Sequence, residues 1–277
     1  MLVRLRGVLN HLPRTRVPGR AAMSTTIHNT NQGCCNNPAV QSDYQPKGTI
    51  KPFGDFKRVY ITGPPTSDNA IVCVYDIFGF FPQTQKGADM LADALRTTIY
   101  MPDFFEPDHP FPIEKFPPKT PEEKQELQNF FGTVASPPKN IEKLVSFGQA
   151  LKSAGAQKLG VYGFCWGGKV TVISAGANTP FNAASIVHPA MLSVDDAENL
   201  TIPLSIYISS DEPLDEYNKI LDVLSKKPFH AKNDHKNYSN MFHGWAAARA
   251  DLKDEENREA FDDVYGKLTE YFKKNLS

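Results

Sequence analysis

The chain lacks the features that define several protein classes. Its 277 residues include four cysteines, which show neither a disulfide spacing nor a C-x-x-C or H-E-x-x-H zinc motif: Cys34, Cys35, Cys73 and Cys165. No stretch approaches the roughly eighteen uninterrupted apolar residues that a membrane span needs. A formal net charge of −1 gives no excess of either sign to attract nucleic acid or an anionic membrane. We therefore expect a soluble protein of a reducing compartment, with no nucleic-acid partner, no membrane span and no metal site.

Acidic residues are missing from the first part of the chain, where Asp43 is the first. The preceding segment, MLVRLRGVLNHLPRTRVPGRAAM, carries five arginines among apolar residues. This composition is typical of a mitochondrial targeting peptide over residues 1–22, or of an extension before a start at Met23 in a cytoplasmic protein. Residues 1–45 are predicted to be an N-terminal extension or flexible arm with two free thiols at Cys34 and Cys35, and residues 46–277 a single domain.

Strand-like and helix-like patterns alternate along the rest of the chain. Strands are predicted at 57–62, 70–76, 97–103, 157–163, 183–190, 202–211 and 230–239, and helices at 83–96, 122–131, 140–154, after Cys165, and at 214–226 and 256–274. This order predicts an α/β fold with a mostly parallel central sheet flanked by helices on both faces. The window 102–121 holds seven of the 22 prolines, which predicts an irregular excursion of the kind that caps a pocket.

The segment LGVYGFCWGGKV at 159–170 is open to two interpretations. Gly163 to Lys169 fits the G-x-x-x-x-G-K of a phosphate-binding loop, but Val170 stands where that loop needs Ser or Thr to bind Mg²⁺. Gly163, Cys165 and Gly167 fit a nucleophile elbow, a tight strand-to-helix turn that needs small residues two before and two after the nucleophile. The elbow places the thiol at a helix N-terminus, which favours the thiolate. A structural cysteine in a glycine-rich packing loop is the plainer alternative.

An elbow predicts that an acid and then a histidine follow the nucleophile, each after a later strand. Asp211 follows the strand IPLSIYISS, and His243 lies in NMFHGWAAAR, so we expect His243 to be the base and Asp211 to orient it. Glu212 and Asp215 are rivals further from the strand end. Among the other histidines, His188 is interpreted as a cap on local backbone, and His230 and His235 as surface residues.

The segments LGVYGFCWGGK, YDIFGF, MPDFFEP, SSDEP and FHGWAAAR together resemble the dienelactone hydrolase family of the α/β-hydrolase fold, over about residues 45–275. The resemblance implies a Cys–His–Asp triad of Cys165, His243 and Asp211. It also implies an oxyanion hole from the main-chain amides of Trp166 and Ile77. No cofactor is implied.

Two positions depart from the family pattern. Asp76 stands where bacterial members have a glutamate that takes part in thiol activation, and Glu106 stands near where a substrate-binding arginine would fall. We therefore expect a neutral or less acidic ester, lactone or thioester as the small-molecule substrate, hydrolysed through a thioacyl intermediate. The residues expected to bind it are Phe78, Phe80, Phe104, Trp245 and Arg249. The alternative is a non-catalytic or thiol redox-sensing protein on the same fold.

Overall fold

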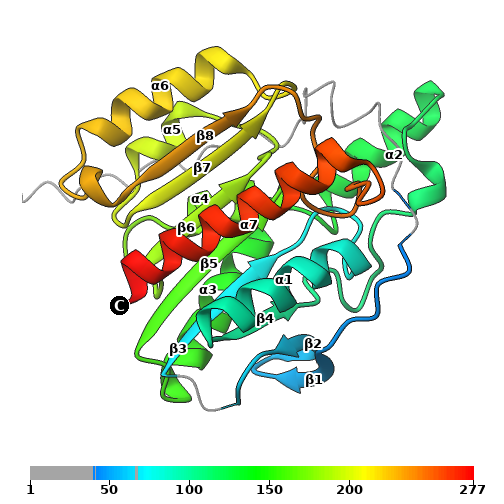
Figure 1. Cartoon of the computed structure of the whole chain (residues 1–277). Helices are drawn as coiled ribbons and strands as arrows, with labels where there is room; N and C mark the ends of the chain where they lie inside the picture. The colour runs from blue at the N-terminus through cyan, green and yellow to red at the C-terminus, as the bar shows by residue number, and fades with distance from the viewer. Residues whose placement is uncertain (1–39, 41, 66–67) are drawn as a thin grey trace, which may run out of the picture.

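The computed structural model describes residues 40, 42–65 and 68–277, and its frame is a single eight-stranded sheet (Figure 1). The strands lie in the order β1-β2-β4-β3-β5-β6-β7-β8. Their bounds are β1 Thr49–Phe53, β2 Phe56–Thr62, β3 Asn69–Val74, β4 Thr98–Pro102, β5 Lys158–Phe164, β6 Ala183–Val187, β7 Leu204–Ser209 and β8 Asp234–Tyr238. The β1–β2 and β2–β4 pairs are antiparallel, and every later pair is parallel.

Helices cover both faces of this sheet, which confirms the predicted α/β-hydrolase architecture. On one face lie α1 (Pro82–Leu95) and α7 (Glu255–Leu276), which contact each other. On the other face, successive contacts join α3 (Pro137–Ser153), α4 (Trp166–Ser174), α5 (Val194–Glu198) and α6 (Leu214–Ser225). The crossovers between parallel strands are therefore helical, as parallel pairing requires.

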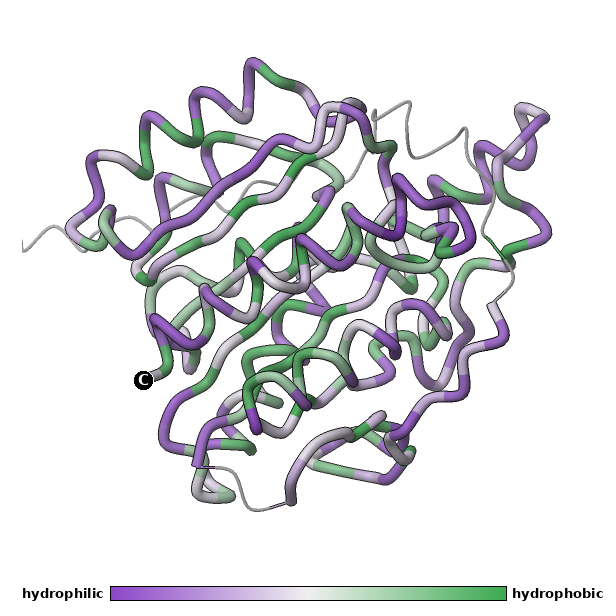
Figure 2. Tube along the Cα trace, in the orientation of Figure 1, coloured by the Kyte–Doolittle hydropathy of each residue, from purple (hydrophilic) through white to green (hydrophobic). Residues whose placement is uncertain are grey.

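The core lies between the central strands and these two helical layers. Every residue of β6 and β7 is buried, and Figure 2 shows hydrophobic central strands beneath helices that alternate between polar and apolar residues. Strands buried on both faces read as continuous apolar runs, so the sequence reveals them readily. By contrast β1, TIKPF, is exposed along most of its length, so no apolar run in the sequence predicts it. The short α5 was also not predicted.

The proline-rich excursion forms little regular structure before α2 (Pro121–Gly132). It contains the short 3₁₀ helix η2, Ile113–Lys115. At the start of α2, Thr120 and Glu123 form a capping box in which each side chain accepts the other's main-chain N–H. The Phe111 N–H donates to the Ile77 carbonyl at 2.9 Å. The excursion is thereby fixed to the loop that follows β3.

Part of the predicted N-terminal extension lies against the sheet domain. Gln83 donates to the Val40 carbonyl at 2.7 Å, and the Tyr44 hydroxyl donates to Asp89 at 2.8 Å. The predictions for residues 1–22 and for Cys34 and Cys35 fall outside the described residues. The boundary after residue 45 stays a prediction.

Strand register brings the ends of the parallel strands to one edge of the sheet. Val74 pairs with Gly163, Phe164 with Val187, and Ser209 with Tyr238. Because these strands end level with one another, the segments that follow them meet at the same edge. Ligand sites of open α/β sheets form at this carboxyl edge.

Candidate active site

Cys165 lies on a sharp turn between β5 and α4, as the glycine spacing predicts. Its φ of 53° and ψ of −118° are unusual for a residue with a side chain. A Cβ on Gly163 would lie 2.1 Å from the Gly167 carbonyl oxygen, and one on Gly167 would lie 2.2 Å from the Val74 carbonyl oxygen. Neither position accepts any other residue without moving main chain. The turn therefore holds Cys165 in a strained, fixed conformation of the kind that a nucleophile elbow has.

The main chain of Cys165 is held by the segment that follows β6. Its N–H donates to the Val187 carbonyl at 3.2 Å, and its carbonyl accepts from the Ala190 N–H at 2.9 Å. The Gly168 N–H donates to the same carbonyl at 3.0 Å. The side chain is 4 % exposed, so the thiol lies at the base of the site rather than on the surface.

His243 is completely buried, and the acid that contacts its ring is Glu212. The Glu212 Oε1 lies 2.5 Å from Nδ1 of His243, while Oε2 accepts from both the N–H and the hydroxyl of Ser209. Asp211 instead accepts the main-chain N–H of His243 at 2.7 Å. The structure thus corrects the prediction that Asp211 orients the imidazole. Both acids hold His243, one by its ring and one by its main chain.

The turn after β7 explains why Glu212, and not Asp211, contacts the imidazole of His243. Ser210 is bound to the Met241 carbonyl through both its N–H and its hydroxyl, which turns the chain away from the strand axis. Glu212 then reaches back over the strand end to Ser209. The number of residues between an acid and the strand end therefore does not indicate which acid contacts the ring of His243. The signal that could have found Glu212 is the SSDEP segment itself, with two adjacent acids after a pair of serines.

The two amides predicted as an oxyanion hole lie at the same edge. Trp166 is the first residue of α4, and Ile77 follows β3 by three residues. Gly167 approaches the carbonyls of Val74 and Tyr75 so closely that the elbow abuts the end of β3. Among the described residues, no main-chain carbonyl accepts from the N–H of Ile77 or of Trp166. Their joint action on a substrate oxygen belongs to the proposal below.

Asp76 joins the loop after β3 to the segment that carries His243. Its Oδ1 accepts from the Phe78 N–H at 3.0 Å, and its Oδ2 accepts from the Ala248 N–H at 3.2 Å. Burial raises the pKa of this carboxyl, and the two N–H donors and the charges of Arg249 and His243 oppose that rise. Both carboxylate oxygens therefore accept main-chain N–H groups, in the neighbourhood of His243.

Arg249 is buried beside this carboxylate, against Phe116 of the proline-rich excursion. Its guanidinium lies 5.2 Å from the centre of the Phe116 ring. Gly244, with φ of 99°, leaves the space for it, since a Cβ there would lie 2.3 Å from the Arg249 Nε. The excursion thus packs directly against the His243 segment.

The predicted substrate-binding aromatics divide into two groups. Phe78 meets Phe116 edge-on at 5.2 Å, and the partly exposed Phe80 lies under the Arg58 guanidinium at 5.4 Å. Phe104 and Trp245 have no exposed surface, and their role as substrate-binding residues stays a prediction. Their rings pack against core neighbours, since Phe104 contacts Trp166 at 6.2 Å and Trp245 contacts Tyr238 at 4.5 Å.

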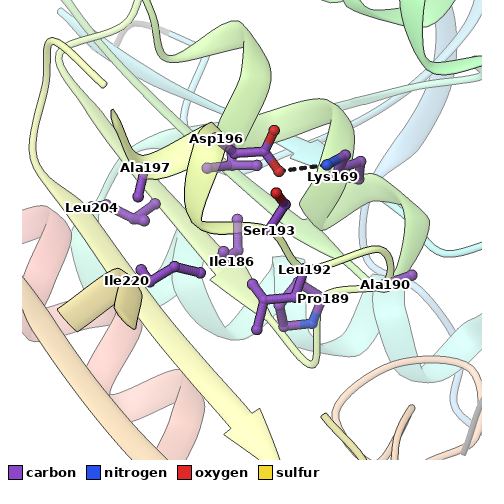
Figure 3. A pocket seen from close by; sticks show the side chains of 11 residues that line it. Lys169, Ile186, Pro189, Ala190, Leu192, Ser193, Asp196, Ala197, Leu204 and Ile220 are labelled. Carbon is purple, nitrogen blue, oxygen red and sulfur yellow. Dashed lines mark hydrogen bonds and ion pairs between the residues drawn. The ribbon is translucent and has the colours of Figure 1, made fainter. Parts of the chain in front are cut away.

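The phosphate-loop interpretation fails at its lysine. Lys169 is 1 % exposed, and its ammonium lies 2.5 Å from the Asp196 carboxylate of α5. Figure 3 shows this pair facing each other beside a pocket whose other lining includes Ile186, Leu204 and Ile220. The Lys169 ammonium is therefore engaged in a buried ion pair that joins α4 to α5.

His188 does not cap local backbone with its ring, contrary to the sequence interpretation. Its main-chain N–H donates to the Tyr207 carbonyl at 2.7 Å. The imidazole instead lies completely buried with its centre 5.1 Å from that of His243. His230 and His235 are exposed, as predicted.

Metal-ligand clusters and membrane-spanning helices would each define a different class of site. Across residues 40, 42–65 and 68–277, no group of three or more His, Cys, Asp or Glu side chains is arranged to hold a metal ion. In the same part of the chain, no helix has both the length and the apolar composition of a membrane span.

A doubly covered parallel sheet with a nucleophile elbow, and with a histidine and an acid from later loops, defines an α/β-hydrolase. The model of the dienelactone hydrolase family matches residues 58–276, and the chain belongs to this family. It is accordingly a hydrolase that acts on ester bonds.

Known proteins of similar sequence and structure agree with this assignment. An uncharacterized AIM2 family protein of Schizosaccharomyces pombe is 35 % identical over 237 residues, covering 84 % of this chain and 94 % of that protein. The human carboxymethylenebutenolidase homolog is 24 % identical over 225 residues, covering 79 % of this chain and 88 % of that protein. The solved structure of a dienelactone hydrolase from Anabaena variabilis has the same fold, with a TM-score of 0.59 and 13 % identity, covering 84 % of this chain and 99 % of that one.

Proposed function

We propose that the chain hydrolyses a carboxylic ester, lactone or thioester through a covalent thioacyl intermediate on Cys165. The observation that carries the proposal is the buried contact between His243 and Glu212 at the sheet edge where the Cys165 elbow lies. A histidine oriented by an acid and placed near a strained nucleophile is the arrangement that nucleophilic acyl transfer needs.

The first half-reaction forms the thioacyl bond. His243 takes the thiol proton, and the sulfur attacks the carbonyl carbon of the ester to give a tetrahedral oxyanion. Glu212 stabilises the resulting imidazolium through Nδ1, and the amides of Ile77 and Trp166 donate to the oxyanion. Collapse breaks the carbon–oxygen bond of the ester, and His243 returns its proton to the departing alkoxide.

The second half-reaction releases the acid. His243 takes a proton from water, the hydroxide oxygen attacks the thioester carbon, and the carbon–sulfur bond breaks. The proton on His243 returns to the sulfur. In this scheme Asp211 is a positioning residue that holds the main chain of His243. Asp76 acts on thiol activation through its charge near His243.

We infer a substrate without strong negative charge. The positive charge of Arg249 acts on the Asp76 carboxyl, and its guanidinium lies over the Phe116 ring, so both groups compete with a substrate anion for this cation. Phe78 and Phe80 add apolar surface near the loop after β3. A neutral aryl ester or lactone matches these surroundings better than a dicarboxylate.

The test is a panel of aryl esters, lactones and thioesters with the full chain, its Cys165→Ala variant and a Cys73→Ala control. Cys73 is the other cysteine among the described residues, buried in β3. We expect turnover and a mass increase equal to the acyl group on the peptide that contains Cys165, in the wild type and the control. Equal turnover by Cys165→Ala would overturn the proposal. A reversible peroxide adduct on Cys165 without hydrolysis of any ester would favour the redox-sensing alternative.

The compartment is a separate proposal. The arginine-rich residues 1–22 favour a mitochondrial protein if they are translated and cleaved, and a cytoplasmic one if translation starts at Met23. N-terminal sequencing of the endogenous protein distinguishes the two.

A further inference from the structure

His188 lies in the segment that holds the nucleophile. The residue before it, Val187, accepts the N–H of Cys165, and Ala190 donates to the Cys165 carbonyl. His188 itself has φ of 37°, in the left-handed region that residues with a Cβ seldom occupy. Non-glycine strain of this kind persists where the surroundings fix the residue, and it gathers at functional sites.

The imidazole of His188 packs among three rings. Its centre lies 5.1 Å from that of His243 with an interplanar angle of 64°, an edge-to-face arrangement. The ring of Phe164 lies 5.5 Å away on a tilted plane, and that of Trp245 lies 6.4 Å away edge-on. His188 thus forms part of the wall that surrounds the catalytic base.

The contact between the two histidines is made by rings and not by a hydrogen bond of His188. Neither Nδ1 nor Nε2 of His188 has a hydrogen-bond partner in another described residue. Burial, and then the neighbouring charges of His243 and Arg249, lower the pKa of His188 well below its ordinary value. Burial therefore favours the neutral form of the His188 ring.

The other charged and titratable groups around His243 come from four segments. Glu212 bonds to its Nδ1 and Asp211 to its main-chain N–H, both from the loop after β7. Asp76 follows β3, and Arg249 lies further along the segment of His243. Cys165 follows β5 and lies at the same edge of the sheet. His188 is the neutral ring in this set, and it follows β6.

We propose that His188 is a positioning residue for His243, an uncharged ring that packs against the base and stabilises its protonated form when the thiol is activated. The inference rests on the proposed function, in which His243 becomes an imidazolium in each half-reaction. An uncharged aromatic ring packed against an imidazolium interacts favourably with the cation, whereas a charged histidine at this position would repel it.

Three substitutions of His188 distinguish the effect of its aromatic ring from the effect of its nitrogen atoms. His188→Phe keeps an aromatic ring and removes both nitrogens, His188→Asn keeps a polar nitrogen and removes the ring, and His188→Leu removes both features. His235→Phe is the matched control, because His235 is an exposed histidine on β8 that bonds to Tyr217. Thermal unfolding monitored by circular dichroism identifies any variant that fails to fold.

The primary measurement is the pKa of His243, followed by NMR of its ring protons, which needs no substrate. We expect His188→Phe and the control to keep the wild-type pKa of His243, and His188→Leu and His188→Asn to lower it by about half a unit. With an ester from the panel, the acid limb of the kcat/KM profile should move to lower pH in the latter two variants, with kcat/KM about threefold lower or more at the plateau.

Two results would overturn the inference. One is a wild-type pKa of His243 and wild-type kcat/KM in His188→Asn, together with a lowered pKa and kcat/KM in His188→Phe. That result would show that a nitrogen of His188, and not its ring, acts on the site. An unchanged pKa of His243 in all three variants would leave His188 as core packing alone. The titration of His243 needs no turnover. If the protein hydrolyses no ester, the proposed function is refuted, and the titration still shows whether His188 acts on the pKa of His243.

Discussion

Glu212 and His243 form a pair with no exposed side-chain surface, and 2.5 Å separates Oε1 of the acid from Nδ1 of the imidazole. A buried carboxylate requires hydrogen-bond donors, and Ser209 supplies two to its other oxygen. The acid is thus fully engaged before any substrate arrives. In the proposed mechanism, such preorganisation lets Glu212 fix the tautomer of His243 and stabilise the imidazolium without rearrangement.

The adjacent acids should respond very differently to removal of their charge. We expect Glu212→Gln to lower kcat/KM about a thousandfold or more, because an amide facing Nδ1 favours the wrong tautomer. We expect Asp211→Asn to lower it by no more than about tenfold, since the amide oxygen can still accept the main-chain N–H of His243. Steady-state kinetics with one ester at constant pH gives both values. A larger loss in Asp211→Asn than in Glu212→Gln would restore Asp211 as the orienting acid.

Much of the fold could be predicted because its central strands are buried on both sides. The continuous apolar runs of β3, β5, β6 and β7 mark them plainly in the sequence. β1 is polar, exposed and held by pairing with β2, so no local pattern marks it. The five-residue α5 is too short for a helical period to be recognised.

The site was predictable where geometry depends on the local chain. Gly163, Cys165 and Gly167 specify the elbow by spacing alone, because the close approaches of the two glycines follow from the turn itself. The choice between Asp211 and Glu212 depends on how Ser210 binds Met241, which is a contact across 31 residues. The contact of His188 with His243 likewise depends on packing across strands. Such contacts have no signature in a single sequence.

The elbow glycine Gly167 should tolerate no side chain. An added Cβ would lie 2.2 Å from the carbonyl oxygen of Val74 and 2.4 Å from that of Tyr75, both of them main-chain atoms. We expect Gly167→Ala to destabilise the protein by about 3 kcal/mol or more, through overpacking against a strand end that cannot shift. Urea denaturation followed by circular dichroism measures the change.

Gly266 provides the matched control for this substitution. It lies within α7, and a Cβ there would meet no atom within 4 Å. We expect Gly266→Ala to stabilise the protein by about 0.5–1 kcal/mol, because alanine loses less conformational freedom in a helix. Similar effects of the two substitutions would show that the close approach at Gly167 is not a constraint in solution.

The buried ion pair of Lys169 and Asp196 should respond to loss of one partner more than to loss of both. We expect Lys169→Met to cost about 3–5 kcal/mol of unfolding free energy, because it leaves the Asp196 carboxylate buried without its cation. The double variant Lys169→Met/Asp196→Leu should recover most of that loss, since it removes both charges.

Urea denaturation of the two single variants and the double variant forms a thermodynamic cycle for this pair. Additive losses would contradict the expected coupling between the two side chains.

Addition of ATP with Mg²⁺ should leave the melting temperature of the wild type unchanged. An increase would revive the phosphate-loop interpretation of Gly163–Lys169.

His188 should make the stability of the protein depend on pH. Burial lowers its pKa well below the ordinary value of 6.5 in the folded state, so below pH 6.5 the unfolded chain binds a proton that the folded chain does not. The unfolding free energy should therefore fall as pH falls through 6.5 toward the folded-state pKa. His188→Phe removes this contribution, so its unfolding free energy relative to the wild type should rise by about 1 kcal/mol between pH 7.5 and pH 5.5. Urea denaturation of both proteins at the two pH values measures the difference, and the other ionisable groups, present in both, largely cancel. A difference that does not change with pH would mean that the folded protein binds a proton on His188 as readily as the unfolded chain does, and burial would then not keep the ring beside His243 neutral.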